Sequence, residues 1–179
     1  LYVRPARLRE RLAEDVDAPL VLFDVGLGAG TNAALAIRHE IKRANAQQRR
    51  RYVSATEKFL RRKKPPLPQS ALATGLKILG YLEDERGLPT LLEFAAAVQP
   101  APVRLEAIIA LRFVAPAESK EAAESLVTAA ESPDRGIAVA ALHGLMRVAL
   151  TAKQAKRLAK LSHHVDREIA GLAMQQLGA

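Results

Sequence analysis

Residues 132–142 read Ser132-Pro-Asp-Arg135-Gly-Ile-Ala138-Val-Ala-Ala141-Leu142, and the pattern that begins at the arginine occurs twice more in the chain. The matching stretches begin at Arg104 and Arg167, which lie 31 residues before and 32 residues after Arg135. In each stretch two alanines stand three positions apart and a large apolar residue follows. Residues at this spacing share one face of a helix, so the pattern predicts helices that pack closely against their neighbours. A repeat of this length indicates an array of similar helical units.

Second helices of a different character are predicted between the arginine-bearing ones, over residues 88–98, 120–131 and 151–161. Each begins with a polar residue that can cap a helix, followed by a second polar residue in the first turn. These pairs are Thr90 with Glu93, Ser119 with Glu121, and Thr151 with Gln154. One repeat upstream of the first arginine, the matching small and apolar positions hold Gly75, Ile78 and Leu79. The sequence therefore predicts antiparallel helix pairs that repeat about every 31 residues.

In these residues the chain resembles the HEAT-like repeats, particularly the short variety found in phycobilisome lyases. The resemblance covers about residues 68–179 and is carried by Ser-Pro-Asp-Arg-x-x-Ala-x-x-Ala-Leu at 132–142. It implies a mainly α fold, with an α-solenoid of HEAT-like helix pairs over residues 69–179. Families of this kind present a concave face to a partner protein and rarely supply catalytic residues.

Residues 1–37 have a different composition. A short apolar run at 20–25 predicts a buried strand, three glycines form a loop after it, and Thr31 or Asn32 is a plausible cap for the helix that follows. The first segment is therefore expected to be a single strand-loop-helix unit, and residues 38–68 are expected to link it to the repeats.

The glycine loop reads Asp24-Val-Gly26-Leu-Gly28-Ala-Gly30 and resembles the first motif of class I S-adenosylmethionine-dependent methyltransferases. Residues 21–37 resemble the methyltransferases that act on tRNA wobble uridines more closely than they resemble nicotinamide-dependent enzymes. The resemblance implies that Asp24, Gly26, Gly28 and Gly30 bind S-adenosylmethionine. The chain lacks an acidic strand end about twenty residues further on and has no room for the other strands of such a domain. Two alternatives therefore stay open, namely a tight turn without a ligand and a membrane helix over residues 18–37.

The middle segment is strongly basic. Between residues 38 and 64 there are eleven Lys or Arg and two Glu, whereas the whole chain carries a net charge of +8. Ser54 and Glu57 have the spacing of a capping box for a short helix through Leu60, and the prolines at 65, 66 and 68 end it. This segment is predicted to be either a solvated linker or an arm that binds nucleic acid or anionic lipid without sequence specificity. The candidate anion-binding residues are Arg49, Arg50, Arg51, Arg61, Arg62, Lys63 and Lys64.

No catalytic constellation stands out in the sequence. The repeated arginines are expected to bind carbonyls or acidic neighbours between stacked repeats, and His143, His163 and His164 lack a third ligand at a spacing that suits zinc. The chain has no cysteine, which excludes disulfides and is compatible with the cytoplasm. We therefore expect a non-catalytic protein-interaction scaffold with a basic arm. The alternative is a methyltransferase-related protein, truncated or fused, that binds S-adenosylmethionine and acts on RNA or protein.

Overall fold

The structure is a computed structural model that describes residues 38, 41–62 and 66–178. Within these ranges the chain is mainly α-helical and contains no strand. The strand and glycine loop expected in residues 1–37, the alternative membrane helix at 18–37, and Lys63 and Lys64 lie outside the described residues. The helices are α4 (Ala46–Leu60), α5 (Gln69–Leu82), the 3₁₀ turn η1 (Glu85–Gly87), α6 (Leu88–Ala95), α7 (Ala101–Val114), α8 (Lys120–Ala130), α9 (Arg135–Leu145), α10 (Ala152–Leu161) and α11 (Arg167–Leu177).

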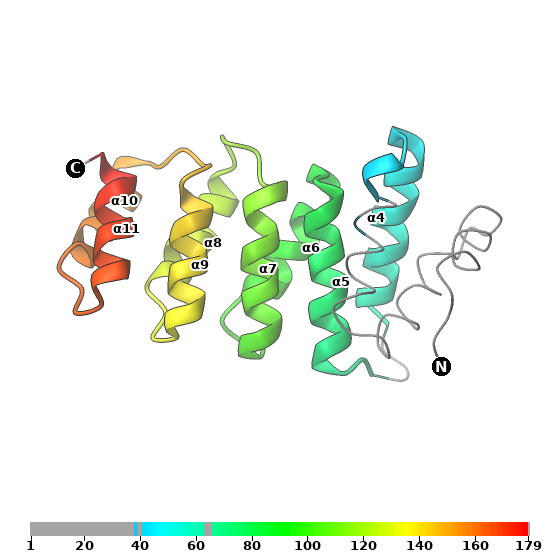
Figure 1. The fold of residues 1–179 in the computed structure, drawn as a ribbon, viewed down its shortest axis with the longest axis horizontal. Coiled ribbons are helices and arrows are strands. Elements are labelled where there is room, and N and C mark those ends of the chain that lie inside the picture. Colours follow the sequence, from blue (N-terminus) through cyan, green and yellow to red (C-terminus); the bar gives the residue numbers. More distant parts are fainter. Residues whose placement is uncertain (1–37, 39–40, 63–65, 179) are drawn as a thin grey trace.

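These helices form an elongated stack of two rows (Figure 1). One row consists of α5, α7, α9 and α11, and the second row consists of α6, α8 and α10. Helices of the second row pack on the next helix along the chain, so α6 pairs with α7, α8 with α9, and α10 with α11. Helix α4 packs on α5 at the other end of the stack from α10 and α11. The predicted helix-pair repeat is therefore confirmed.

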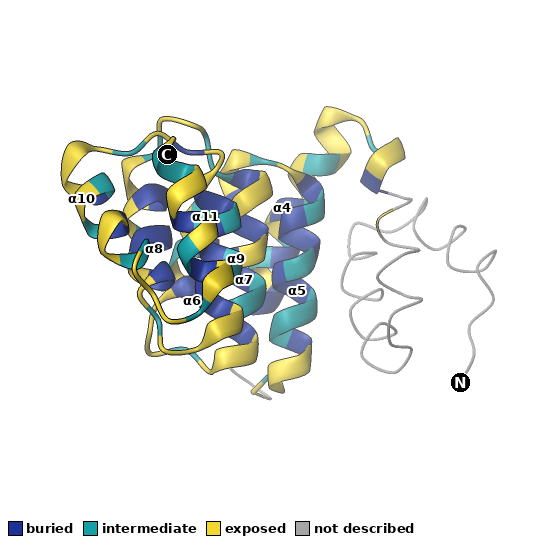
Figure 2. Cartoon of the chain, turned by 60° about the vertical axis from the view of Figure 1, so that its left-hand side comes forward, coloured by how far each residue is buried: buried dark blue, intermediate teal, exposed yellow. Residues whose placement is uncertain are grey.

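The core lies between the two rows, where the buried residues face one another (Figure 2). Ala107 and Ala110 of α7 are buried, as are Ala138 and Ala141 at the same positions of α9. Small side chains at these positions let neighbouring helices of the first row approach closely. One such close approach is between α5 and α7, where a Cβ atom built on Gly80 would lie 3.0 Å from Cβ of Ala110. The spacing of small residues in the repeat thus has a direct packing role.

The helix starts agree with the sequence patterns in most of the repeat. The side chain of Ser119 accepts a hydrogen bond from the N–H of Ala122 at the start of α8. Thr151 and Gln154 form a complete capping box at the start of α10. Asp134 caps α9 by accepting from the N–H of Ile137. These side chains satisfy N–H groups that have no partner inside the helix.

One predicted helix start and one predicted cap are wrong. The helix of the basic segment begins at Ala46 rather than at Ser54, because Asn45 and Gln48 form its capping box. The predicted cap Thr90 lies inside α6, which begins at Leu88 and has no side-chain cap. Both residues follow a local pattern of capping, but in each case the helix has already begun upstream. The basic segment therefore holds a full-length helix whose apolar side packs against the repeat.

Candidate functional site

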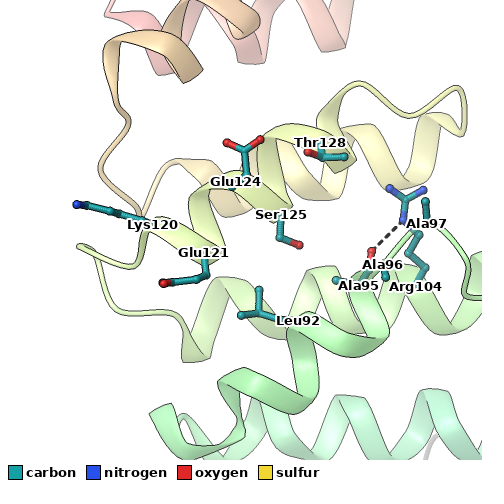
Figure 3. Close-up of a pocket in the computed structure, with 10 residues that line it drawn as sticks. All are labelled: Leu92, Ala95, Ala96, Ala97, Arg104, Lys120, Glu121, Glu124, Ser125 and Thr128. Carbon is teal, nitrogen blue, oxygen red and sulfur yellow. Dashed lines mark hydrogen bonds between the residues drawn. The ribbon is translucent and has the colours of Figure 1, made fainter.

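A hollow of about 520 Å³ opens between α6 and α8 in the second row (Figure 3). Its floor includes apolar side chains of α6 and the turn after it, and its walls carry charged and hydroxyl groups of α8. Such a combination of apolar surface with a few fixed polar groups is typical of binding sites. The residues that line the hollow are Leu92, Ala95, Ala96, Ala97, Arg104, Lys120, Glu121, Glu124, Ser125 and Thr128.

Arg104 closes one end of this hollow (Figure 3). Its Nε atom donates to the carbonyl oxygen of Ala95 at 3.1 Å, and its Nη1 atom lies 3.5 Å from Oγ of Ser132 in the next repeat. Arg104 therefore ties the end of α6 to the next repeat, as expected of the first repeated arginine. Because the guanidinium group is held by two fixed partners, the shape of this end of the hollow is set before any ligand arrives.

A cluster of charges fixes the α8 side of the hollow against α10. Glu124 accepts hydrogen bonds from Nε2 of Gln154 at 3.0 Å and from Nη1 of Arg157. Arg157 also donates to both oxygens of Glu131, at 2.9 and 2.6 Å. The hydrogen bonds from Gln154 and Arg157 lower the pKa of Glu124, and the hydrogen bond from Arg157 lowers the pKa of Glu131. Both carboxyls are thus held in the charged form, which favours the stacked arrangement of α8 and α10.

The second repeated arginine behaves as predicted and the third has a different environment. Arg135 forms an ion pair with Asp166 at 2.7 Å and a further one with Glu168, both in α11 or at its start. Arg167 is exposed, and its side chain has no hydrogen bond or ion pair with another described residue. Arg104 and Arg135 therefore link successive repeats through different acceptors, a carbonyl and a hydroxyl for the former and carboxylates for the latter.

Helix α4 packs the basic segment against the stacked helices. Val53, Thr56, Phe59 and Leu60 are buried on its inner side. Five of the seven predicted anion-binding residues lie in α4 or at its end: Arg49, Arg50, Arg51, Arg61 and Arg62. All except Arg49 are exposed. A helix with this division of residues packs its apolar side on the stack and presents most of its cations to solvent.

Not every basic residue of α4 is turned toward solvent. Arg49 donates to the carbonyl oxygens of Ala44 at 3.2 Å and Leu82 at 3.4 Å, so it fastens α4 to the end of α5. Arg61 donates to Oγ1 of Thr90 at 3.2 Å. The exposed face that remains for an anionic partner is therefore centred on Arg50 and Arg51.

The sequence patterns missed the buried polar link between α4 and α6. Oγ1 of the fully buried Thr90 donates to Oε1 of Glu57 at 2.6 Å and accepts from Arg61. They also missed the cluster around Arg157. Glu124 and Arg157 stand 33 residues apart, as do Glu57 and Thr90, so each pair spans about one repeat. Opposite charges at the period of the repeat were the signal that could have revealed the link between Glu124 and Arg157.

The predicted cofactor residues Asp24, Gly26, Gly28 and Gly30 lie outside the described residues, so binding of S-adenosylmethionine stays a prediction. Among residues 38, 41–62 and 66–178, no three His, Asp or Glu side chains gather in the way that metal ligands do. None of the described helices is long and apolar enough to cross a membrane.

Comparisons with known proteins give a structural relative but no family. No protein-family model matches the chain, and no curated protein matches it in sequence. A crystal structure of an engineered protein, solved as a target of the Northeast Structural Genomics Consortium, is similar with a TM-score of 0.59. It is 16% identical in sequence, and the match covers 97% of this chain and 87% of the engineered one. This likeness shows the fold alone. Over the residues that the structure describes, the chain has an all-helical, repeat-like fold.

Proposed function

We propose that the chain is a non-catalytic interaction scaffold of HEAT-like repeats, which binds a partner protein on its stacked helices and an anionic partner on α4. Support comes from the repeat in sequence, from the resemblance to HEAT-like families, and from the polar links that fasten successive helix pairs. Stacked helix pairs of this kind offer extended surfaces on which another protein can dock.

The observation that carries the proposal is the hollow between α6 and α8. Its apolar floor includes Leu92 and Ala95, and Arg104 at one end is already held in place by its hydrogen bond to the carbonyl oxygen of Ala95. A site whose groups are oriented in advance loses less conformational entropy when a partner binds. The hollow is open to solvent along the row, which suits a segment of another protein.

Matched substitutions test this site. Ala96 and Ala117 are both exposed loop alanines, but only Ala96 lines the hollow. Ala96→Trp should fill part of the hollow, whereas Ala117→Trp should leave it open. In quantitative affinity capture with the full chain, we expect some proteins to bind both the wild type and Ala117→Trp but not Ala96→Trp. An identical set of captured proteins for all three chains would contradict docking at the hollow.

The basic surface of α4 is proposed to tether the scaffold to phosphate groups of nucleic acid or of anionic lipid. Arg50 and Arg51 carry this proposal because both are exposed on a helix that is packed against the stack. Each cation that neutralises a phosphate releases counterions, so binding should weaken steeply with salt. Arg50→Ala with Arg51→Ala should reduce both the affinity and the salt dependence for single-stranded RNA or for anionic vesicles. Comparison of the two probes decides between the two sources of phosphate.

The alternative function rests on the glycine loop at residues 24–30. Calorimetric titration of S-adenosylmethionine into the full chain tests it directly. Heat that is lost in Gly28→Val would support a cofactor site. Absence of heat and of thermal stabilisation would leave the glycine motif as a turn.

A further inference from the structure

A second hollow, of about 370 Å³, lies on the first row of helices where α5 and α7 meet the region around α4. It shares no residue with the hollow between α6 and α8. Its residues come from two packed helices of the stack and from the basic segment. They are Arg38, Ile41, Lys42, Arg49, Lys77, Gly80, Tyr81, Glu83, Glu106, Ile109, Ala110 and Phe113.

The α7 side of this hollow is apolar and open to solvent. Ile109 is 38% exposed and Phe113 is 41% exposed, although both are large apolar side chains. They stand one turn apart on α7, and the half-buried ring of Tyr81 lines the same hollow from α5. Contiguous apolar surface that stays exposed in a folded protein marks a place where another molecule binds.

The opposite side of this hollow is positively charged. Four cationic residues and two glutamates line the hollow, so cations are in excess. The guanidinium group of Arg38 lies over the ring of Tyr81 at 5.4 Å, and Arg49 donates to backbone carbonyls. Neither arginine has a carboxylate partner among the described residues. Their charge is therefore available to an acidic group that enters the hollow.

Glu106 adds a third feature. Its Oε1 atom pairs with Nζ of Lys77 at 3.3 Å, but its Oε2 atom is buried and has no hydrogen-bond partner among the described residues. A buried acceptor without a donor is unfavourable, so this carboxylate oxygen keeps a hydrogen-bonding capacity that the described residues do not use.

We propose that this hollow docks an acidic amphipathic segment of a partner protein. An apolar side chain of that segment inserts between Ile109 and Phe113, while its carboxylates pair with Arg38 and Lys42. A nucleic acid would use the cations and would stack a base on Phe113, but it would leave the exposed aliphatic side chain of Ile109 without an apolar partner. The combination therefore favours a protein segment. The inference extends the proposed scaffold function to a second surface and does not require that the hollow between α6 and α8 binds anything.

The probe is a fluorescent synthetic peptide of Glu, Leu and Phe that carries its apolar residues on one helical face. A control peptide has the same composition with its apolar residues spread around the helix. Fluorescence anisotropy with the full chain should show that the amphipathic peptide binds more tightly than its control. Ile109→Ser with Phe113→Ser should weaken this binding about tenfold or more, because apolar anchors carry most of the affinity at such sites. Lys42→Glu should weaken it too, whereas Lys156→Glu on the exposed side of α10 should leave it within about twofold.

Three outcomes would overturn the proposal. The first is no binding of the amphipathic peptide at about 1 mM, the weakest affinity that a real site would show. The second is equal binding of the two peptides, and the third is binding that survives the double serine variant but is lost in Arg50→Ala with Arg51→Ala. The last result would indicate a general polyanion surface. Melting temperature and far-ultraviolet circular dichroism check that each variant is folded. If the double serine variant does not fold, the loss of peptide binding in Lys42→Glu tests the proposal in its place. Because Ala96→Trp leaves this hollow untouched, loss of partners in that variant and loss of peptide binding here report on separate sites.

Discussion

Arg135 of α9 and Asp166 at the start of α11 are joined by a hydrogen bond of 2.7 Å between Nε and Oδ2. The other oxygen of the same carboxylate accepts from the N–H groups of Glu168 and Ile169. One side chain thus caps a helix and binds the preceding repeat at once.

The two roles of Asp166 can be separated by substitution. Asp166→Asn keeps an oxygen for the cap but loses the charge that pairs with Arg135, and Asp166→Ala loses both roles. We expect the midpoint of urea unfolding to fall slightly in the asparagine variant and clearly further in the alanine variant, because an exposed ion pair contributes less than a helix cap. Equal midpoints for the two variants would contradict the capping role.

Two glycines within helices should respond oppositely to alanine. A Cβ atom on Gly80 would lie 3.1 Å from Cα of Ala110, which is backbone and cannot turn aside. Gly80→Ala should therefore lower the free energy of unfolding by about 1–3 kcal/mol. At Gly171 nothing lies within 4 Å of such an atom, so Gly171→Ala should raise it by roughly 0.5–1 kcal/mol through helix propensity. Chemical denaturation measures both, and a gain in stability for Gly80→Ala would show that α5 and α7 are not this close.

Removal of the buried hydroxyl of Thr90 should lower the free energy of unfolding. Thr90→Val keeps the shape but leaves Oε1 of Glu57 without its donor, at a cost of about 1–3 kcal/mol. Thr90→Ser keeps the donor and is the matched control. Hydrogen exchange should show faster opening of α4 in the valine variant and little change of α4 in the serine variant. Unchanged exchange in both would mean that this link does not hold α4 on the stack.

Acid should weaken the contact between α8 and α10. The folded-state pKa values of Glu124 and Glu131 are both below the ordinary value of 4.5. The unfolded chain therefore binds more protons than the folded chain as the pH falls through this value. The stabilisation is complete above about pH 5 and is lost as the pH falls below the lowered values. Arg157→Met should lose part of this dependence when urea unfolding is followed from about pH 7 to pH 3. Lys156→Met is the control, and an identical acid dependence of both variants would contradict the role of Arg157.

Much of the fold followed from the sequence because the repeat is carried by local patterns. The alanine spacing at 138–141, the cap at Ser119 and the capping box at Thr151 depend on residues within a few positions of one another, and all appear as predicted. The start of α4 was also within reach, because Asn45 and Gln48 have the spacing of a capping box. Ser54 and Glu57 also have the spacing of a capping box. Only the structure shows that Ser54 already lies inside the helix that begins at Ala46.

The candidate sites were less predictable. Thr90 resembles a cap in sequence because its real partner, Glu57, stands 33 residues away and no local pattern shows it. The hollow at Ala96 depends on the distance between α6 and α8, and the sequence pattern of a single helix does not predict that distance. Five of the seven predicted anion-binding residues are on the described part of the basic segment, but the structure shows that Arg49 is a fastening residue. Binding of an anion by the others stays a prediction.

The side-chain hydrogen bonds between successive helix pairs join residues that stand only 26 to 33 positions apart. Among the described helices, these hydrogen bonds close loops of about one repeat, so the entropy cost of loop closure does not grow as further pairs are added. Each pair of helices is stabilised mainly by its nearest neighbours. When one pair unfolds, the pair next to it loses an interface and becomes less stable, so unfolding proceeds along the stack from pair to pair. A mechanical pull on the two ends should accordingly release the described helices in steps of about one repeat rather than in a single event.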